Sequence, residues 1–402
     1  MTRWLLPSIV FALCSAPTAR ADSSLAKEIA KQRGLTQKKA AKKPARDDAP
    51  TTATLDREAL RTRLAKLADD PAVQAATRAE GIALARWGLI PRDLDYRATL
   101  VSLYTDQIDR RAPDPAWNEL VATERALRDA KFDFAAFVAV PAGENDASLA
   151  RRALVEGDGI ALLIELVLAR KGKSAPWDNT QVTLDLGRAM TMPTGDALDK
   201  APVAIREAML FPFRAGLAFV ASLRRYESWS AVDAAYKRPP RSTEQILHPE
   251  KYAADEQPVH VTLDIPAELP DAKLVHSTVW GELGFALFLR AHGIPVETAN
   301  IAAAGWAGDR VITVSLGDAG PAVGLARYEW DSEIDAIEAY EAAVRALDDT
   351  TIGATIDHAD ARTRWLALDG RTSLVSRQGT RVTIAVGVPA PLLPALTVAM
   401  EK

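Results

Sequence analysis

The chain has 402 residues, of which 48% are hydrophobic and 25% are charged, and its formal net charge at pH 7 is −4. This balance predicts no concentrated basic surface, which argues against nucleic acid as a partner. The length is sufficient for a large core and suggests two or so structural units. No run after the N-terminus is long and apolar enough to predict a transmembrane segment.

Residues 1–21 have the features of a secretory signal peptide. Arg3 precedes a short apolar run, and the small-x-small sequence Ala19-Arg20-Ala21 is typical of a cleavage site. We therefore expect an exported protein, either periplasmic or extracellular. The single cysteine, Cys14, lies inside this segment, so the mature chain is expected to have no thiol, no disulfide and no thiolate metal ligand.

Residues 22–54 combine lysines with alanine, threonine and proline and contain little apolar surface. Such a composition does not offset the entropy cost of ordering, so we predict a flexible tether. We interpret this tether as a solvated spacer. The alternative is that its basic part contacts an anionic lipid or cell-wall polymer, where each charge contributes about 1 kcal/mol.

Residues 55–175 are predicted to form a helical domain. Leucines recur at helical spacing over residues 60–67, and Asp70-Pro71 is typical of the start of a second helix, which Gly88 would end. Three more helices are predicted, over residues 94–108, 115–137 and 146–170.

Residues 176–402 are predicted to form a mixed domain. Helices are expected over residues 204–225, 279–290 and 333–347, and strands over residues 259–265 and 311–316. Ser242 and Gln245 form a capping box. Turns at Asp369-Gly370 and Gln378-Gly379 indicate a β-meander at the C-terminal end. The predicted fold class is therefore α-rich α+β, with a helical half followed by a smaller mixed half.

Several stretches are distinctive in composition and order: residues 87–95, 126–133, 153–158, 211–216, 229–233, 239–252, 281–284, 304–310 and 330–336. Two of them read Ala126-Leu-Arg-Asp-Ala-Lys-Phe-Asp133 and Ala153-Leu-Val-Glu-Gly-Asp158. Together they resemble a family of secreted bacterial and archaeal zinc metallopeptidases of gluzincin-like type. In that family an HExxH helix is followed by a helix with an Ala-Leu-Val-Glu-Gly-Asp motif. The resemblance covers most of the expected mature chain.

The resemblance implies that active relatives hold zinc between the two histidines of HExxH and a glutamate of the second helix, with the HExxH glutamate as general base. In the register set by residues 126–133, Val121 and Arg125 stand at the histidine positions and Ala122 at the general base. None of these three side chains can bind zinc or accept a proton. Glu156 is the one matching ligand.

The resemblance therefore implies a degenerate site of Val121, Ala122, Arg125, Glu156 and Asp158, with no catalytic residue and no cofactor, where active relatives hold zinc. The five histidines do not restore it, because no two of them are three or four residues apart. For Arg125 two placements are open. It either enters the vacated metal position and pairs with Glu156 or Asp158, or it faces solvent.

From these features we expect an exported, non-catalytic protein that binds a peptide or protein partner through a retained cleft. One alternative is a weakly metal-dependent peptidase that holds manganese or calcium by carboxylates alone, from Glu124, Asp129, Glu156 and Asp158. A second alternative is a structural protein of the cell envelope, anchored through residues 23–54.

Overall fold

The computed structural model describes residues 24–35, 57–110, 114–190, 193–225, 227–317, 320–350, 354–359 and 361–400. Its N-terminal helices are α2 (Ser24–Arg33), α3 (Arg57–Ala68), α4 (Pro71–Arg86), α5 (Tyr96–Asp109), α6 (Pro115–Phe132), α7 (Phe134–Phe137), α8 (Asn145–Ala169), α9 (Thr180–Met190), α10 (Asp196–Lys200), α11 (Val203–Arg224), α12 (Trp229–Lys237), α13 (Thr243–Leu247) and α14 (Pro249–Ala253).

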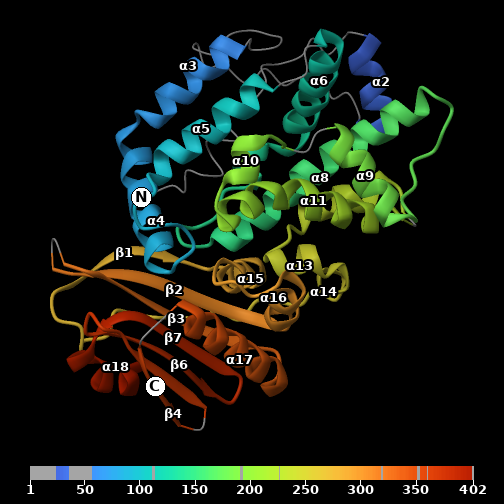
Figure 1. Ribbon diagram of the computed structural model, residues 1–402. Coiled ribbons are helices and arrows are strands. Elements are labelled where there is room, and N and C mark those ends of the chain that lie inside the picture. Colours follow the sequence, from blue (N-terminus) through green and yellow to red (C-terminus); the bar gives the residue numbers. More distant parts are fainter. Residues whose placement is uncertain are drawn as a thin grey trace.

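The C-terminal elements are β1 (Ala272–Thr278), α15 (Gly281–Ala291), α16 (Val296–Ala303), β2 (Trp306–Leu316), β3 (Ala322–Trp330), α17 (Glu333–Thr350), β4 (Thr355–Ala359), β5 (Arg362–Leu366), β6 (Arg371–Gln378), β7 (Arg381–Pro389), η1 (Ala390–Leu392) and α18 (Leu393–Met400). Figure 1 shows the helical half above a C-terminal sheet, which confirms the α-rich α+β fold. The domain boundary predicted at residue 175 lies between α8 and α9, and α11 packs against α8 across it.

The prediction of a flexible tether is wrong for residues 24–33, which form the packed helix α2. Ala26, Ile29, Ala30 and Arg33 are all buried and follow the i, i+3, i+4, i+7 spacing of one helix face. This face lies against α6 and α8. The physical reason is that two alanines beside a larger apolar residue, Ile29, form a continuous apolar helix face, whose burial stabilises the helix. Residues 36–56 and the predicted signal peptide lie outside the described residues.

The predicted helices up to residue 170 are confirmed with one difference. The helix expected over residues 115–137 is divided into α6 and α7 at Asp133, whose φ of 49° is in the left-handed region. The Asp129 side chain accepts a hydrogen bond from the Phe134 backbone N–H at 2.8 Å, which satisfies a donor that the break leaves free. Asp133 itself caps α7 through Ala136.

The seven strands form one antiparallel sheet in the order β1-β2-β3-β7-β6-β5-β4. Its last four strands follow one another as neighbours, which confirms the predicted meander. Gly370 and Gly379 lie in the two predicted turns and adopt φ values of 77° and 60°. Glycine has no Cβ and reaches these values without strain.

Both faces of the sheet are buried, because side chains of successive strand residues point to opposite sides. Val311, Ala326 and Ile384 point to the face covered by α15, α16 and α17. Their neighbours Ile312, Leu325 and Ala385 belong to a second cluster with residues of α18 on the other face. Helix α4 also packs on β1, β2 and β3, and so joins the helical half to the sheet.

The strand predicted over residues 259–265 is not present. The segment is extended, and Val261 is buried while Val259 is exposed, but its backbone does not form a ladder with a neighbouring strand. Instead Arg327 donates to the Thr262 carbonyl oxygen at 3.3 Å, and Val259 N–H bonds to Ala307. The alternation of apolar residues therefore indicates that one side of this extended segment is partly buried, and not that the segment is a strand of the sheet.

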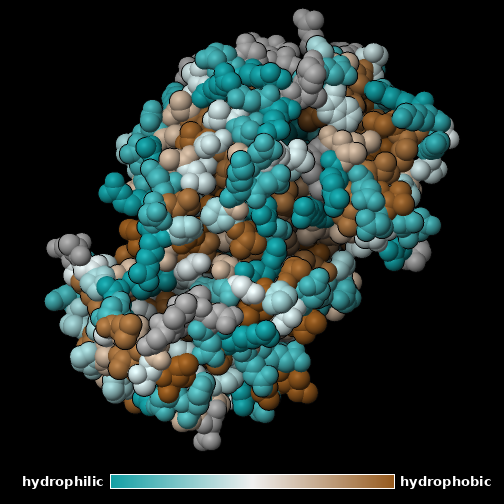
Figure 2. Space-filling view, in the orientation of Figure 1, coloured by the Kyte–Doolittle hydropathy of each residue, from teal (hydrophilic) through white to brown (hydrophobic). Residues whose placement is uncertain are grey.

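The face of the molecule seen in Figure 2 is mostly hydrophilic over the helical half, with hydrophobic residues interspersed. This distribution is typical of amphipathic helices packed around a common core. Among the residues that the structure describes, no helix combines the length and the apolar character needed to cross a membrane.

Candidate functional site

Helix α8 has five buried charged residues, and three of them lie within two turns of one another near its middle. Arg152, Glu156 and Asp158 are 5%, 8% and 0% exposed. Helices α2, α6 and α11 pack around α8 and separate these groups from bulk water. A buried charge is costly unless another group pairs with it, so the partners of these three residues define the candidate site.

Glu156 is paired with Arg125 of α6. The Arg125 Nη1 atom lies 3.2 Å from Glu156 Oε2, and both residues are 8% exposed. Burial acts to raise the pKa of the Glu156 carboxyl, but Arg125, Arg152 and Arg128 outweigh it and hold the pKa below its usual range. Of the two placements predicted for Arg125, the structure therefore has the buried pair.

Val121 and Ala122 lie on α6 one turn before Arg125 and are half-buried. Val121 packs against the apolar cluster around α8. The packing of α6 on α8 places Arg125 beside Glu156. Neither Val121 nor Ala122 adds an atom that could bind a cation.

Asp158 is bound by partners from other elements. Arg33 of α2 donates to both its oxygens, at 2.8 and 3.3 Å, and the Tyr236 hydroxyl of α12 donates to Oδ2 at 2.9 Å. Arg128 Nη1 lies 3.6 Å from the same carboxylate. Arg33 also donates to Asp233 at 2.8 Å. Asp158 therefore connects α2, α6, α8 and α12 rather than facing Arg125.

The remaining carboxylates of the metal alternative do not converge. Arg128 donates to Glu124 at 2.7 Å, although burial still raises the pKa of Glu124. Asp129 accepts a hydrogen bond from the Phe134 backbone N–H at the start of α7. Arg128 contacts both Glu124 and Asp158, whereas Glu156 is bound by Arg125. Among the described residues, these four carboxylates do not form a group of oxygen ligands close enough to hold one metal ion.

The glycines of the motif stretches have packing roles. A Cβ atom on Gly157 would lie 2.1 Å from the Gly216 carbonyl oxygen, and one on Gly216 would lie 2.0 Å from the Ala153 carbonyl oxygen. These contacts set how closely α8 and α11 approach. A Cβ atom on Gly159 would lie 2.4 Å from Arg128 Nη2. Gly157 and Gly216 therefore let the helices touch, and Gly159 leaves room for a buried guanidinium.

A second charged cluster lies near α13 and α14. Lys251 Nζ lies 2.6 Å from Glu244, 2.9 Å from Glu256 and 2.6 Å from Asp331. These three carboxylates lie close enough together to hold a metal ion. The Lys251 ammonium already supplies a cation to all three, so the cluster is satisfied without one.

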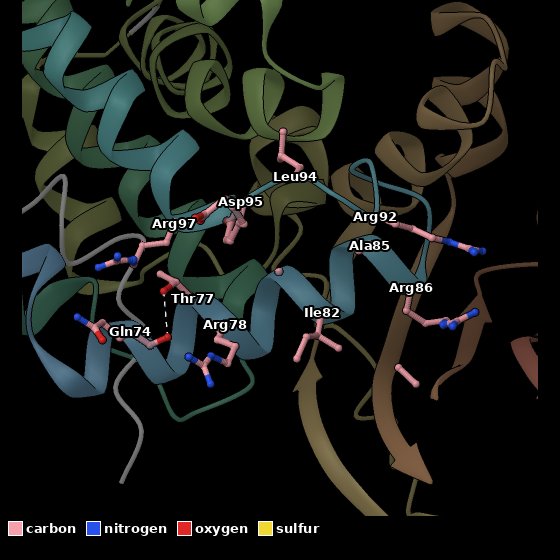
Figure 3. A pocket seen from close by; sticks show the side chains of 13 residues that line it. Gln74, Thr77, Arg78, Ile82, Ala85, Arg86, Arg92, Leu94, Asp95 and Arg97 are labelled. Carbon is pink, nitrogen blue, oxygen red and sulfur yellow. Dashed lines mark hydrogen bonds between the residues drawn. The ribbon is translucent and has the colours of Figure 1, made fainter. Parts of the chain in front are cut away.

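An open groove of about 540 Å³ runs along α4 and the start of α5. It is lined by four arginines, Arg78, Arg86, Arg92 and Arg97, and Figure 3 shows Arg86 and Arg92 extending in the same direction at one end. Burial lowers the pKa of Arg86 to about 10, with repulsion from Arg371 and Arg92 adding to the effect. Its Nε atom is buried and has no hydrogen-bond partner. Positive charge therefore exceeds negative charge at this end of the groove.

The residues that sequence reasoning missed are Arg33, Arg128, Asp233 and Tyr236. Arg33 fell within the predicted tether, although its spacing from Ala26 and Ile29 completes a helix face. Arg128 and Asp233 belong to stretches that were recognised only as motif matches, and Tyr236 lies between two such stretches. A buried Asp158 carboxylate needs hydrogen-bond donors or positively charged partners. A search of the neighbouring stretches for arginine and tyrosine side chains could therefore have identified some of them.

The comparisons with known proteins concern mainly the sheet. A family model for a domain of unknown function, DUF8575, matches residues 272–397, from the first residue of β1 into α18. No curated protein and no solved structure matches the chain. These comparisons add no support for the metallopeptidase resemblance of the helical half, which stays a prediction.

Proposed function

We propose that this chain is an exported, non-catalytic protein on a metallopeptidase-like scaffold, and that it binds a peptide or protein partner. The observation that carries the proposal is the buried pair of Arg125 and Glu156. In the predicted register, a guanidinium stands at the position of a metal ligand and binds the one matching carboxylate. A fixed cation of the protein thus takes the electrostatic role of the metal ion.

Zinc fits poorly with the residues present. A structural or catalytic zinc ion needs three or four ligands from the protein, and Val121 and Ala122 supply none. Arg125 repels a cation and engages the carboxylate that remains. The carboxylate-only alternative is not favoured by the structure either, because each of its four members has another partner.

The groove of Figure 3 is the surface we assign to the partner, in place of a cleft at the degenerate site. Arg92 repels Arg86 at one end of the groove, and an anionic ligand would relieve this repulsion. Guanidinium groups bind carboxylates by paired hydrogen bonds, so an acidic peptide segment fits the groove chemically. The partner proposed is therefore a peptide or protein with a run of Asp or Glu residues.

The metallopeptidase scaffold is tested by restoring the motif. In the triple variant Val121→His, Ala122→Glu, Arg125→His, two imidazoles would stand beside Glu156, and we expect near-stoichiometric zinc by elemental mass spectrometry. Adding Glu156→Gln to this variant should reduce its zinc content. Near-stoichiometric zinc in the unaltered protein would contradict the proposal. A folded triple variant without zinc would contradict the register.

The partner class is tested by fluorescence anisotropy with a labelled hexaglutamate peptide and a matched hexaglutamine peptide. We expect binding of the glutamate peptide alone, with an affinity that falls as salt concentration rises. The double variant Arg86→Glu, Arg92→Glu should weaken binding at least about tenfold, since it reverses two charges at one end of the groove. Arg188→Glu, at an exposed site on α9, is the matched control. Equal binding of both peptides would overturn the assignment.

A further inference from the structure

A cavity of about 190 Å³ lies where the helical half meets the sheet. Residues of α4, α5, α8 and α11 line one side, and residues of β1, β2 and α15 line the other. Most of its wall is apolar, with Trp87, Leu149 and Trp280 among the lining residues. An engineered apolar cavity of about 150 Å³ accepts benzene, so a cavity of this size can hold a small organic molecule.

One charged side chain in the wall has no hydrogen-bond partner in the part of the chain that the structure describes. Arg152 is 5% exposed, and its Nε atom is buried without a hydrogen bond. Within the described residues, Arg152 neither donates a hydrogen bond nor has a carboxylate within 4 Å. The positive charge of Arg152 helps to lower the pKa of Glu156, but the Glu156 carboxylate is hydrogen-bonded to Arg125. Leaving a buried guanidinium unpaired is costly, so an anion is expected to compensate it.

The other titratable groups of the cavity do not supply that anion. Glu80 is hydrogen-bonded to Tyr96, and removal from bulk water raises the pKa of Glu80 to about 8. Burial lowers the pKa of His276 to about 4 and raises that of Asp146 well above its usual range. The Asp146 carboxylate accepts hydrogen bonds from the Thr243 backbone N–H and hydroxyl and so has donors of its own. None of these groups is hydrogen-bonded to the Arg152 guanidinium.

Two further polar atoms of the wall are unused. The Thr313 hydroxyl, on a residue 1% exposed, and the Asn145 Oδ1 atom are buried without a hydrogen-bond partner. Native structures contain few such atoms, and those that occur usually meet a ligand or an ordered water molecule. An apolar wall with a few convergent polar groups is typical of a small-molecule site.

From this geometry we infer that the cavity binds a small monocarboxylate, with the carboxylate at Arg152 and a compact apolar body against Trp87, Leu149 and Trp280. The guanidinium supplies the charge and the paired donors that a carboxylate takes. The cavity shares the lining residue Tyr96 with the arginine-lined groove, but Arg152 lines only the cavity, and the inference does not depend on what the groove binds.

The test uses isothermal titration calorimetry of the intact protein with hexanoate and with 1-hexanol, which has a similar apolar body without the charge. We expect hexanoate to bind more tightly than 1-hexanol. Arg152→Met keeps the length of the side chain and removes its charge, and should weaken hexanoate binding at least about tenfold while leaving 1-hexanol binding unchanged. Arg188→Met is the matched surface control.

A second variant keeps the inference testable if Arg152→Met does not fold. Ala208 lines the cavity, and Ala208→Phe should fill it and abolish binding of both probes while Arg152 stays in place. Hexanoate binding that survives Ala208→Phe, or is unchanged in Arg152→Met, would overturn the inference. Absence of binding by both probes to the unaltered protein would also overturn it, and would show that the cavity holds water only.

Discussion

The side chains that determine the helical half are buried charges in matched sets. Arg125 pairs with Glu156, Arg128 with Glu124, and Arg33 with Asp158. A buried pair contributes little net stability compared with apolar residues of the same volume, because both ions lose their hydration. Removing one member of a buried pair is strongly destabilising, since the other charge remains buried and unpaired. Two of these pairs join different helices, α6 to α8 and α2 to α8, whereas Arg128 and Glu124 both lie on α6.

The first prediction concerns Arg125→Ala. Glu156 would lose the partner that lowers its pKa and would remain buried, so unfolding free energy should fall by about 3 to 5 kcal/mol. The measurement is urea denaturation monitored by circular dichroism at neutral pH. The control is Arg61→Ala, which breaks the exposed pair with Asp109 and should cost less than about 1 kcal/mol. Equal small losses for both variants would contradict the buried pair.

The second prediction is a pH dependence that arises from Glu80. Its pKa is raised to about 8, so the folded state holds a proton that the unfolded state releases near pH 4.5. The folded state binds more protons across this interval, and stability should therefore decline from about pH 5 to pH 8, by about 3 kcal/mol from Glu80 alone.

The check is denaturation of Glu80→Gln across the same pH range. The amide has no proton to lose, so the decline should flatten, while the part due to Glu244 and Asp309, whose pKa values are raised by burial to about 7 and about 6, should remain. An unchanged slope in Glu80→Gln would show that Glu80 is ionised in the folded protein.

At the scale of elements, sequence patterns located most helices but not all strands. Helix starts were visible because Asp70 caps α4 through Ala72 and Val73, and Ser242 caps α13. Strand β1 was missed because its pattern does not alternate cleanly, and Leu274 is 55% exposed. The pairing of Arg125 with Glu156 was one of two predicted placements. The choice between them depends on how α6 packs on α8, which helical periodicity alone does not determine.

The third prediction concerns the crossing of α8 and α11. Gly157→Ala would place a methyl group 2.1 Å from the backbone of Gly216, and backbone yields less readily than a side chain. The helices must separate, which should cost about 1 to 3 kcal/mol or more, as in other overpacked cores.

The matched control is Gly81→Ala, also within a helix, where the new methyl group would lie 3.1 Å from the Tyr96 side chain. Here the gain in helix propensity, about 1 kcal/mol, should offset the contact. Thermal denaturation of both variants compares them directly. If Gly157→Ala were as stable as Gly81→Ala, the close helix crossing would be incorrect.

For the whole molecule, the match to a domain of unknown function begins at β1. The apolar core of the sheet nevertheless includes residues that precede β1 in the sequence. Trp87 and Leu89, from the end of α4, belong to the same apolar cluster as Phe285, Tyr328 and Trp330. The Trp87 ring centroid lies 5.1 Å from that of Trp280 and 6.1 Å from that of Phe288. The sheet thus depends on a helix that the family model does not include, and the cavity lies at this junction.

The last prediction tests this coupling with Trp87→Ala. Trp87 is 2% exposed, and a Cβ atom on Gly324 of β3 would lie 2.7 Å from its ring, so the tryptophan fills a space that glycine leaves. Its removal should cost about 3 to 5 kcal/mol. Because Trp87 contacts both halves, hydrogen exchange should accelerate in α4 and α5 as well as in β2 and β3.

The control is Trp365→Ala, a fully buried tryptophan of β5 away from the junction, which should accelerate exchange in the sheet alone. Acceleration confined to α4 in Trp87→Ala would mean that the halves unfold independently, and that the cavity between them is not held closed by a shared core.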